Sequence, residues 1–191
     1  MNVKRCEWAN NSELMKEYHD KEWGVPQHDD RILFEFLILE GMQAGLSWDT
    51  ILRKRDNFRE AFDDFNYTKI ANYSEKKAEN LLQNKGIIRN RLKILSVIAN
   101  AKGFLEIQKE YGTFDKYIWK FVNYTPIINS WNSLSELPSN TEMSERISKD
   151  LKKRGFKFVG TTIIYAFMQA VGLVNDHTTY CFRYENLSKN K

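Results

Sequence analysis

Residues 29–40 read Asp-Asp-Arg-Ile-Leu-Phe-Glu-Phe-Leu-Ile-Leu-Glu, and this stretch decides the fold. Asp29 or Asp30 can cap a helix, and the apolar residues from Ile32 to Leu39 then cover nearly every side of it. A helix that is apolar on nearly every side is buried on nearly every side. We therefore predict a central core helix with an acid, Glu40, directly after its apolar run.

Outward from this helix, apolar positions recur at three-to-four spacing without sustained strict alternation, which predicts an all-α protein. The further helices that we expect are 48–62, 67–73, 74–83, 90–108, 114–122, 144–153 and 159–171. The polar stretch 129–142, with Pro138, indicates a loop. A chain of 191 residues is long enough for one domain with a proper core, or for one domain with a small lobe.

The composition is that of an ordinary globular protein, with 42% hydrophobic residues, three prolines and nine glycines. The longest apolar stretches, 32–39 and 163–174, contain polar breaks and fall short of the roughly 20 residues that span a bilayer, so we expect no membrane partner. The net charge of +4 mildly favours a polyanionic partner. No apolar stretch follows the first residues, so we expect no secretory signal and a cytoplasmic location.

The only two cysteines, Cys6 and Cys181, each have a histidine nearby in sequence, His19 and His177. Two thiolates and two imidazoles fill the tetrahedral shell of a structural Zn²⁺, which would join the N-terminal and C-terminal segments. Two alternatives stay open. The thiols can be buried beside unrelated histidines, or they can form a disulfide, which is rare in a reducing cytoplasm.

Residues 83–91, Gln-Asn-Lys-Gly-Ile-Ile-Arg-Asn-Arg, connect two expected helices. Gly86 can adopt the positive φ that a tight connection needs, and the amides before the next helix would form an anion site. Arg89, Arg91 and Lys93 would reinforce this site, and a DNA phosphate would fit there. The alternative is an ordinary C-cap glycine followed by solvated basic residues.

A second basic cluster is interleaved with aromatic residues, which suits either a phosphate-backbone groove or a helix end. Its basic members are Lys152, Lys153, Arg154 and Lys157.

Glu40 is carried into or beside the core, where a lone carboxylate must be hydrogen-bonded, ion-paired or waiting for a ligand. Trp8, Tyr18 and Trp23 lie near the proposed metal ligands in sequence, and Trp48 follows the core helix. An aromatic box with one acid suits a flat, cationic ring, because stacking and ion pairing act together. The alternative is that these aromatic residues are core and that Glu40 meets a lysine.

Stretches of sequence spread over nearly the whole chain match one family. They are Arg5-Cys6 with Trp8, Tyr18-His19-Asp20, and residues 22–26, 39–41, 43–48, 86–89, 151–162 and 172–177. With these stretches the chain resembles the 3-methyladenine DNA glycosylase I (TAG) family. One departure is the tail, where Phe182-Arg183-Tyr184 replaces the small or cysteine-rich endings of some relatives.

The resemblance implies an all-α helix-hairpin-helix glycosylase fold in a single domain over residues 1–191, with a hairpin lobe at about 50–120. The residues of the hairpin that would grip double-stranded DNA are Gly86, Ile87, Ile88 and Arg89. The implied zinc ligands are Cys6, His19, His177 and Cys181, and the zinc is structural. The implied base pocket consists of Glu40, Tyr18 and Trp48, with Trp8 and Trp23 in the same neighbourhood.

The resemblance also implies a reaction, in which the enzyme flips out and excises 3-methyladenine from alkylated DNA. Methylation at N3 gives the base a positive charge and weakens its glycosidic bond, so a strong general acid is unnecessary. The family lacks the aspartate that usually follows the hairpin, and here no Asp occurs between Gly86 and Asp115. In the pocket, the base would stack on Trp48, and Tyr18 would add a polar contact. Glu40 would be the catalytic residue, because its carboxylate accepts hydrogen bonds from the base edge and favours the positive form of the base.

Asn90 and Arg91 open the second hairpin helix, and no lysine there is well placed to form a Schiff base. We therefore expect a monofunctional enzyme that leaves an abasic site without strand cleavage and releases free 3-methyladenine. Separately, we expect a monomer. A non-catalytic, zinc-stabilised helix-hairpin-helix DNA-binding protein is the alternative, and a zinc-stabilised interaction protein without a nucleic-acid role is a third. The acid among aromatic residues separates the enzyme from both, since neither requires it. His28 is expected to be exposed.

Overall fold

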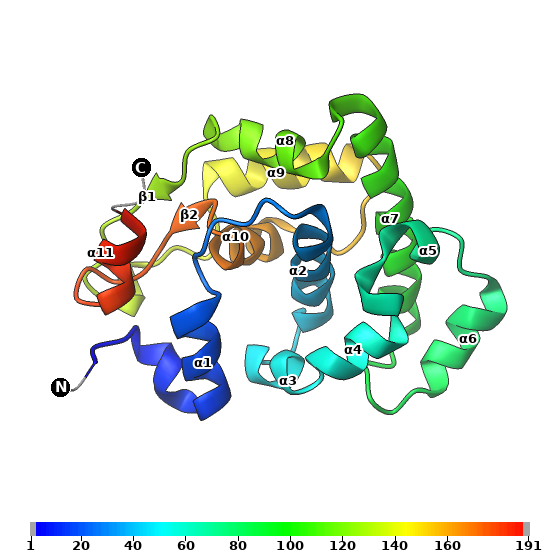
Figure 1. Ribbon diagram of the computed structural model, residues 1–191, viewed down its shortest axis with the longest axis horizontal. Coiled ribbons are helices and arrows are strands. Elements are labelled where there is room, and N and C mark those ends of the chain that lie inside the picture. Colours follow the sequence, from blue (N-terminus) through cyan, green and yellow to red (C-terminus); the bar gives the residue numbers. More distant parts are fainter. Residues whose placement is uncertain (1–2, 189–191) are drawn as a thin grey trace.

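The computed structural model describes residues 3–188, which form mainly helices around the central helix α2 (Figure 1). In chain order the elements are η1 (Glu7–Asn11), α1 (Glu13–Lys21), α2 (Asp30–Gln43), α3 (Trp48–Arg53), α4 (Arg55–Ala61), η2 (Asp63–Phe65), α5 (Tyr67–Ile70), α6 (Glu75–Gln83), α7 (Arg91–Tyr111), α8 (Phe114–Trp119), η3 (Lys120–Val122), β1 (Ile127–Ile128), η4 (Leu134–Glu136), α9 (Glu142–Lys153), α10 (Thr161–Ala170), β2 (Val174–Asn175) and α11 (Phe182–Ser188). The prediction of an all-helical protein is confirmed, apart from one pair of two-residue parallel strands.

Helix α2 is the core helix that the sequence predicts. The Asp29 carboxylate caps it by accepting hydrogen bonds from the backbone amides of Arg31 and Ile32. All residues from Leu33 to Met42 are buried, and helices α3, α7, α8 and α10 pack around them. Within this core the Phe34 ring lies edge-on to Phe104, 5.1 Å away between centroids. The C-terminal end of α2 is therefore buried, and an acidic residue there has its backbone inside the protein.

Several element boundaries differ from the prediction. The expected helix 48–62 is divided into α3 and α4 at Lys54, whose amide donates to the carbonyls of Ile51 and Leu52. Two helices, α1 and α11, were not expected, because each is short and carries few apolar residues. Helices of this length depend on tertiary packing, and α1 packs against η1 and α3.

The N-terminal segment that precedes α1 and the C-terminal helix α11 lie at the same end of the molecule (Figure 1). The Phe182 amide donates to the Lys4 carbonyl at 3.0 Å, which places the start of α11 beside the N-terminal segment. Helices α4 to α7 occupy the opposite end of the molecule. No helix within residues 3–188 is long and apolar enough to cross a membrane.

Candidate functional site

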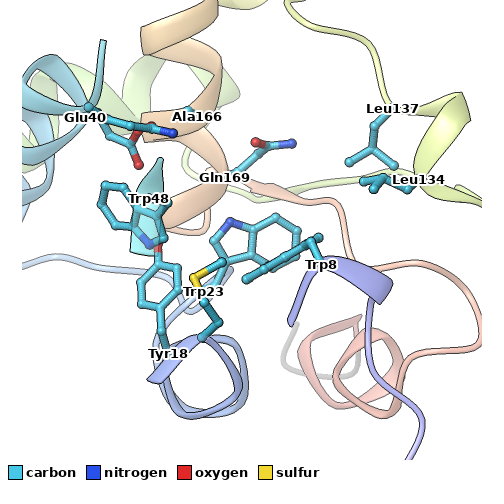
Figure 2. Close-up of a pocket in the computed structure, with 11 residues that line it drawn as sticks. Trp8, Tyr18, Trp23, Glu40, Trp48, Leu134, Leu137, Ala166 and Gln169 are labelled. Atoms are coloured by element: carbon cyan, nitrogen blue, oxygen red, sulfur yellow. The ribbon is translucent and has the colours of Figure 1, made fainter. Parts of the chain in front are cut away.

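A cavity of about 300 Å³ opens beside the C-terminal half of α2. In Figure 2, Glu40, Tyr18 and Trp48 lie on one side of it, and Trp8, Leu134 and Leu137 on the other. The lining residues are Trp8, Met15, Tyr18, Trp23, Glu40, Gln43, Trp48, Leu134, Leu137, Ala166 and Gln169. The cavity is at the lower end of the range for small-molecule sites, which suits one flat heterocycle.

Glu40 is the acid of this cavity. Its side chain is 4% exposed, and it has no hydrogen-bond or ion-pair partner among residues 3–188. Burial raises its pKa to about 8, because a carboxylate loses hydration there without gaining a compensating charge. The alternative that Glu40 meets a lysine is therefore wrong. A cationic ligand that enters the cavity would favour the ionised form.

Tyr18 and Trp48 form an aromatic wall next to this acid. Their ring centroids are 5.3 Å apart at an interplanar angle of 49°. The indole Nε1 of Trp48 is buried without a hydrogen-bond partner among the described residues. Burial, and then the charge of Glu40, raise the pKa of Tyr18, so its hydroxyl keeps its proton. The wall thus offers rings for stacking and an indole N–H that no other residue within 3–188 accepts.

Trp8 and Trp23 separate the cavity from the buried cysteines and histidines. Their ring centroids are 5.0 Å apart in an edge-on arrangement. Trp8 also lies edge-on to His19 at 5.3 Å, and Trp23 to His177 at 4.6 Å. One face of this indole pair thus contacts the candidate metal centre, while both residues line the cavity.

Several lining residues were missed by the sequence analysis. Ala166 and Gln169 lie three residues apart on one face of α10, but no local pattern shows that this face meets α2. Leu134 and Leu137 belong to the stretch that we expected to be only a loop. The Gln169 amide donates to Asp176 at 2.7 Å, which holds the side chain in place.

The structure brings Cys6, His19, His177 and Cys181 together, all buried, with their ligand atoms within 4.8 Å of one another. The Cys181 Sγ lies 3.4 Å from His19 Nε2 and 3.5 Å from His177 Nδ1, and the Cys6 Sγ lies 3.6 Å from the same Nδ1. Both cysteines are free, so the disulfide alternative is wrong. This cluster could hold a metal ion.

Hydrogen bonds outside the cluster orient the two imidazoles. His19 Nδ1 lies 2.8 Å from the carboxylate of Asp20, and His177 Nε2 lies 3.1 Å from the Trp23 carbonyl. Each outer nitrogen faces an oxygen acceptor, to which its N–H donates a hydrogen bond, and the lone pair of the inner nitrogen then points into the cluster. Burial also lowers the pKa of His177, which keeps this ring neutral. Neutral imidazoles with inward lone pairs are the form that binds metals.

The loop 84–90 joins α6 to α7, but Gly86 does not adopt a positive φ. The prediction of its conformation is wrong, and close packing explains the glycine instead. A Cβ at this position would lie 3.1 Å from the Cβ of Asn57. The Gly86 carbonyl also accepts a hydrogen bond from Lys54 at 3.1 Å.

The backbone amides of Ile88 and Arg89 have no hydrogen-bond partner among residues 3–188. The Arg89 side chain is exposed, and Arg91 is exposed with a long contact of 3.9 Å to Glu75. Ile87 is buried, so only its backbone can face a ligand. At the start of α7, two backbone amides thus lack a partner among the described residues, and two arginine side chains are exposed.

Lys93 does not belong to this exposed group, contrary to our expectation. Its side chain is buried, and the ammonium donates to the carbonyls of Met42 and Ala44. The second basic cluster is also divided, because Arg154 is engaged by Glu110 and Asp150. Its lysines, Lys152, Lys153 and Lys157, are exposed. His28 is exposed, as expected.

Comparisons with known proteins give the family. The chain matches the methyladenine glycosylase family over residues 8–184. It is 50% identical to DNA-3-methyladenine glycosylase 1 of Escherichia coli, covering 95% of this chain and 97% of that protein. It is 48% identical to DNA-3-methyladenine glycosylase of Haemophilus influenzae, covering 93% and 96%.

The fold agrees with these matches. It resembles a crystal structure of 3-methyladenine DNA glycosylase I (TAG) with a TM-score of 0.91 and 51% identity, covering 94% of this chain and 98% of the other. An all-helical domain with a buried acid in an aromatic cavity thus has the architecture of a base-excising glycosylase. The chain belongs to the methyladenine glycosylase family.

Proposed function

We infer that this protein is a DNA-3-methyladenine glycosylase, which hydrolyses the N-glycosidic bond of 3-methyladenine in alkylated DNA. Curated relatives of that name are about half identical over nearly the whole chain. A similar solved structure, 34% identical with a TM-score of 0.91, is a complex with 3-methyladenine. The observation that carries the proposal here is the unpartnered acid, Glu40, beside an aromatic cavity.

The proposed mechanism uses the charge of the damaged base. A 3-methyladenine nucleotide that is flipped out of the stack carries a positive charge. Glu40 ionises against this charge and holds the base edge, while the ring stacks on Trp48. The base leaves neutral without being protonated, and water captures the sugar cation. A normal adenine is neutral and gains less from Glu40, so selectivity follows from electrostatics.

We further propose that the enzyme is monofunctional. The residues lining the cavity include no lysine, and Schiff-base chemistry needs an amine within reach of the sugar. Lys93 is tied to two backbone carbonyls and is not free to act as this amine. The product is then an abasic site in an intact strand.

The loop 84–90 with the N-terminus of α7 is the proposed hairpin that holds double-stranded DNA. Two free amides, those of Ile88 and Arg89, and the positive end of a 21-residue helix favour a phosphate. Arg89 and Arg91 add charge next to them. Gly86 lets the loop approach α4 closely. Lys93 is not among the proposed DNA contacts, because its side chain is buried.

We propose that the metal is zinc and that its role is structural. Bonds of about 2.3 Å to sulfur and about 2.0–2.1 Å to nitrogen place tetrahedral neighbours about 3.5 Å apart. The three sulfur-to-nitrogen distances, 3.4, 3.5 and 3.6 Å, fit this geometry. Four protein ligands leave no open position, so the ion would join Cys6 and His19 to His177 and Cys181 without taking part in the reaction.

The direct test is incubation with methylated DNA, followed by identification of the bases that are released. We expect free 3-methyladenine and intact strands that alkali then breaks at the abasic sites. Binding to DNA without release of any base would instead favour the non-catalytic DNA-binding alternative.

We also propose that the protein acts as a single-domain monomer in the cytoplasm. Its elution volume in size-exclusion chromatography tests whether it is a monomer.

A further inference from the structure

Lys93 is a buried ammonium without a part in the proposed chemistry. It is the third residue of α7, 6% exposed, and its Nζ donates to the carbonyls of Met42 at 2.8 Å and Ala44 at 2.7 Å. These carbonyls lie at the C-terminal end of α2, where a helix leaves carbonyls unpaired and favours a cation. The ammonium therefore closes the end of the helix that carries Glu40.

Residues 42–47, here called the 42–47 turn, connect two polar groups of the cavity, the Glu40 carboxyl and the Trp48 indole. Glu40 precedes the turn by two residues, and Trp48 follows it directly. Gly45 allows the reversal, with a φ of +80°. Apart from Lys93, the turn has one internal backbone bond, from Leu46 to Gln43. The two bonds from Lys93 therefore join this turn to a long, rigid helix.

The other side of Lys93 faces the proposed DNA contact. The Asn90 side chain caps α7 by accepting from the backbone amide of Lys93 at 3.1 Å. The free amides of Ile88 and Arg89 come directly before that cap. The first turn of α7 thus presents its amides to the solvent and its lysine to the 42–47 turn.

We propose that Lys93 is a positioning residue, which holds the 42–47 turn against α7 and so sets the spacing between the Glu40 carboxyl and the Trp48 indole. The identity of the base in that space rests on the proposed function. Lys93 does not act by neutralising the acid, because Glu40 has no ion-pair partner among the described residues. It acts through the backbone on either side of the cavity.

The test compares Lys93→Met, which keeps most of the volume and removes the donors, with Lys102→Met. Lys102 is an exposed lysine of the same helix without an ion-pair partner among residues 3–188. In ligand-free Lys93→Met, we expect the ¹H–¹⁵N resonance of the Trp48 indole, assigned with Trp48→Phe, to shift. We also expect excision about 100-fold slower, since a misplacement of about 1 Å can have this effect. Lys102→Met should match the parent protein in both measurements.

Binding to undamaged DNA separates positioning from phosphate contact. Its salt dependence should be the same in Lys93→Met and in the parent. If the slope of log affinity against log salt concentration were smaller by about one in Lys93→Met, Lys93 would be a phosphate contact and the proposal would be overturned. An unchanged Trp48 resonance together with an unchanged excision rate would overturn it as well.

The parent protein supplies a measurement that does not depend on the folding of a variant. When free 3-methyladenine fills the cavity, the ¹⁵Nζ resonance of Lys93 should shift, and that of Lys102 should not. No shift at Lys93 in a protein that binds the base would overturn the proposal. Failure of the proposed function is a different result, because the parent protein itself would then release no base from methylated DNA. The Trp48 resonance of the ligand-free protein would still test the role of Lys93 in that case.

Discussion

Two buried polar sites lie back to back in this protein, and they differ in how their polar atoms are satisfied. Neighbouring residues of α1 serve the two sites, with Tyr18 in the cavity and His19 in the Cys/His cluster. In the cluster, both imidazoles have outer acceptors and inner sulfur neighbours. In the cavity, Glu40 and the Trp48 Nε1 have no partner among residues 3–188.

In the proposed function, the cluster stabilises the fold and the cavity receives the substrate, and this difference agrees with that division. An unpartnered buried acid costs free energy, so the surrounding structure must supply the stability that keeps it in place. The Trp8 and Trp23 rings contact the cluster histidines and also line the cavity. The cluster can therefore keep the cavity in shape without contacting the base.

The largest expected effect comes from breaking the cluster. In Cys181→Ser, we expect the free energy of unfolding to fall by about 5 kcal/mol or more, since structural zinc contributes of this order or above. This corresponds to a melting temperature lower by about 10–20 °C in calorimetry. Thr179→Ala, an exposed neighbour, is the control and should change it little. If the purified protein holds no metal and Cys181→Ser melts like the control, the cluster has no stabilising ion.

The second prediction compares the same substitution at two buried glutamates of α2, Glu40 and Glu35. Glu40 has no partner in the described part of the chain, whereas the Glu35 carboxylate is paired with Arg55 at 2.6 Å and with Arg59 at 2.9 Å. Glu40→Gln should weaken binding of 3-methyladenine about 10- to 100-fold, because a charge-assisted hydrogen bond is lost, without lowering stability. Glu35→Gln should instead lower stability by about 3 kcal/mol and leave base binding unchanged.

Isothermal titration with free base and chemical denaturation measure these two quantities. Undamaged duplex DNA is the binding control for both variants, and neither variant should change its affinity. If Glu40→Gln lost the same affinity for the base and for undamaged DNA, the assignment of Glu40 to base recognition would be wrong.

The pH dependence follows from the Glu40 pKa of about 8, against an ordinary value of 4.5. Because the folded pKa is raised, the folded state favours the protonated acid, so stability falls as the pH rises from 4.5 to about 8. Glu40→Gln should remove this fall and become more stable than the parent at pH 8. Recognition needs the carboxylate, so kcat/KM should rise with pH until about 8 in the parent and not in the variant. A flat profile in the parent would exclude this titration.

How much of this could be predicted from the sequence depends on how local each signal is. The core helix was predictable because the apolar residues within 32–39 cover nearly every side of the helix. The four cluster ligands came from residue types and the family resemblance, since nothing local places Cys6 beside Cys181. The contribution of Gln169 was not predictable, because it depends on how α10 crosses α2.

Lys93 shows an overlooked signal. Val97 and Asn100 follow it at spacings of four and seven, so the helical period places all three on the buried face of α7. The charge of a lysine suggested exposure, and its neighbours in sequence were read as a basic patch. The helical period was the better guide, because unpaired carbonyls at the end of α2 satisfy the ammonium.

The smallest expected effect concerns a surface that belongs to neither buried site. Arg89→Ala should weaken damaged and undamaged DNA alike, by about tenfold or less, and reduce the slope of log affinity against log salt by about one. Arg146→Ala, on α9 away from the 84–90 loop (Figure 1), is the matched control and should keep the parent slope. In the proposed complex Arg89 contacts a phosphate and Glu40 contacts the base, so the double variant should lose the sum of the two free energies. A marked departure from additivity would mean that DNA binding and base recognition are energetically coupled. The contact of Lys93 on α7 with the 42–47 turn would allow such coupling.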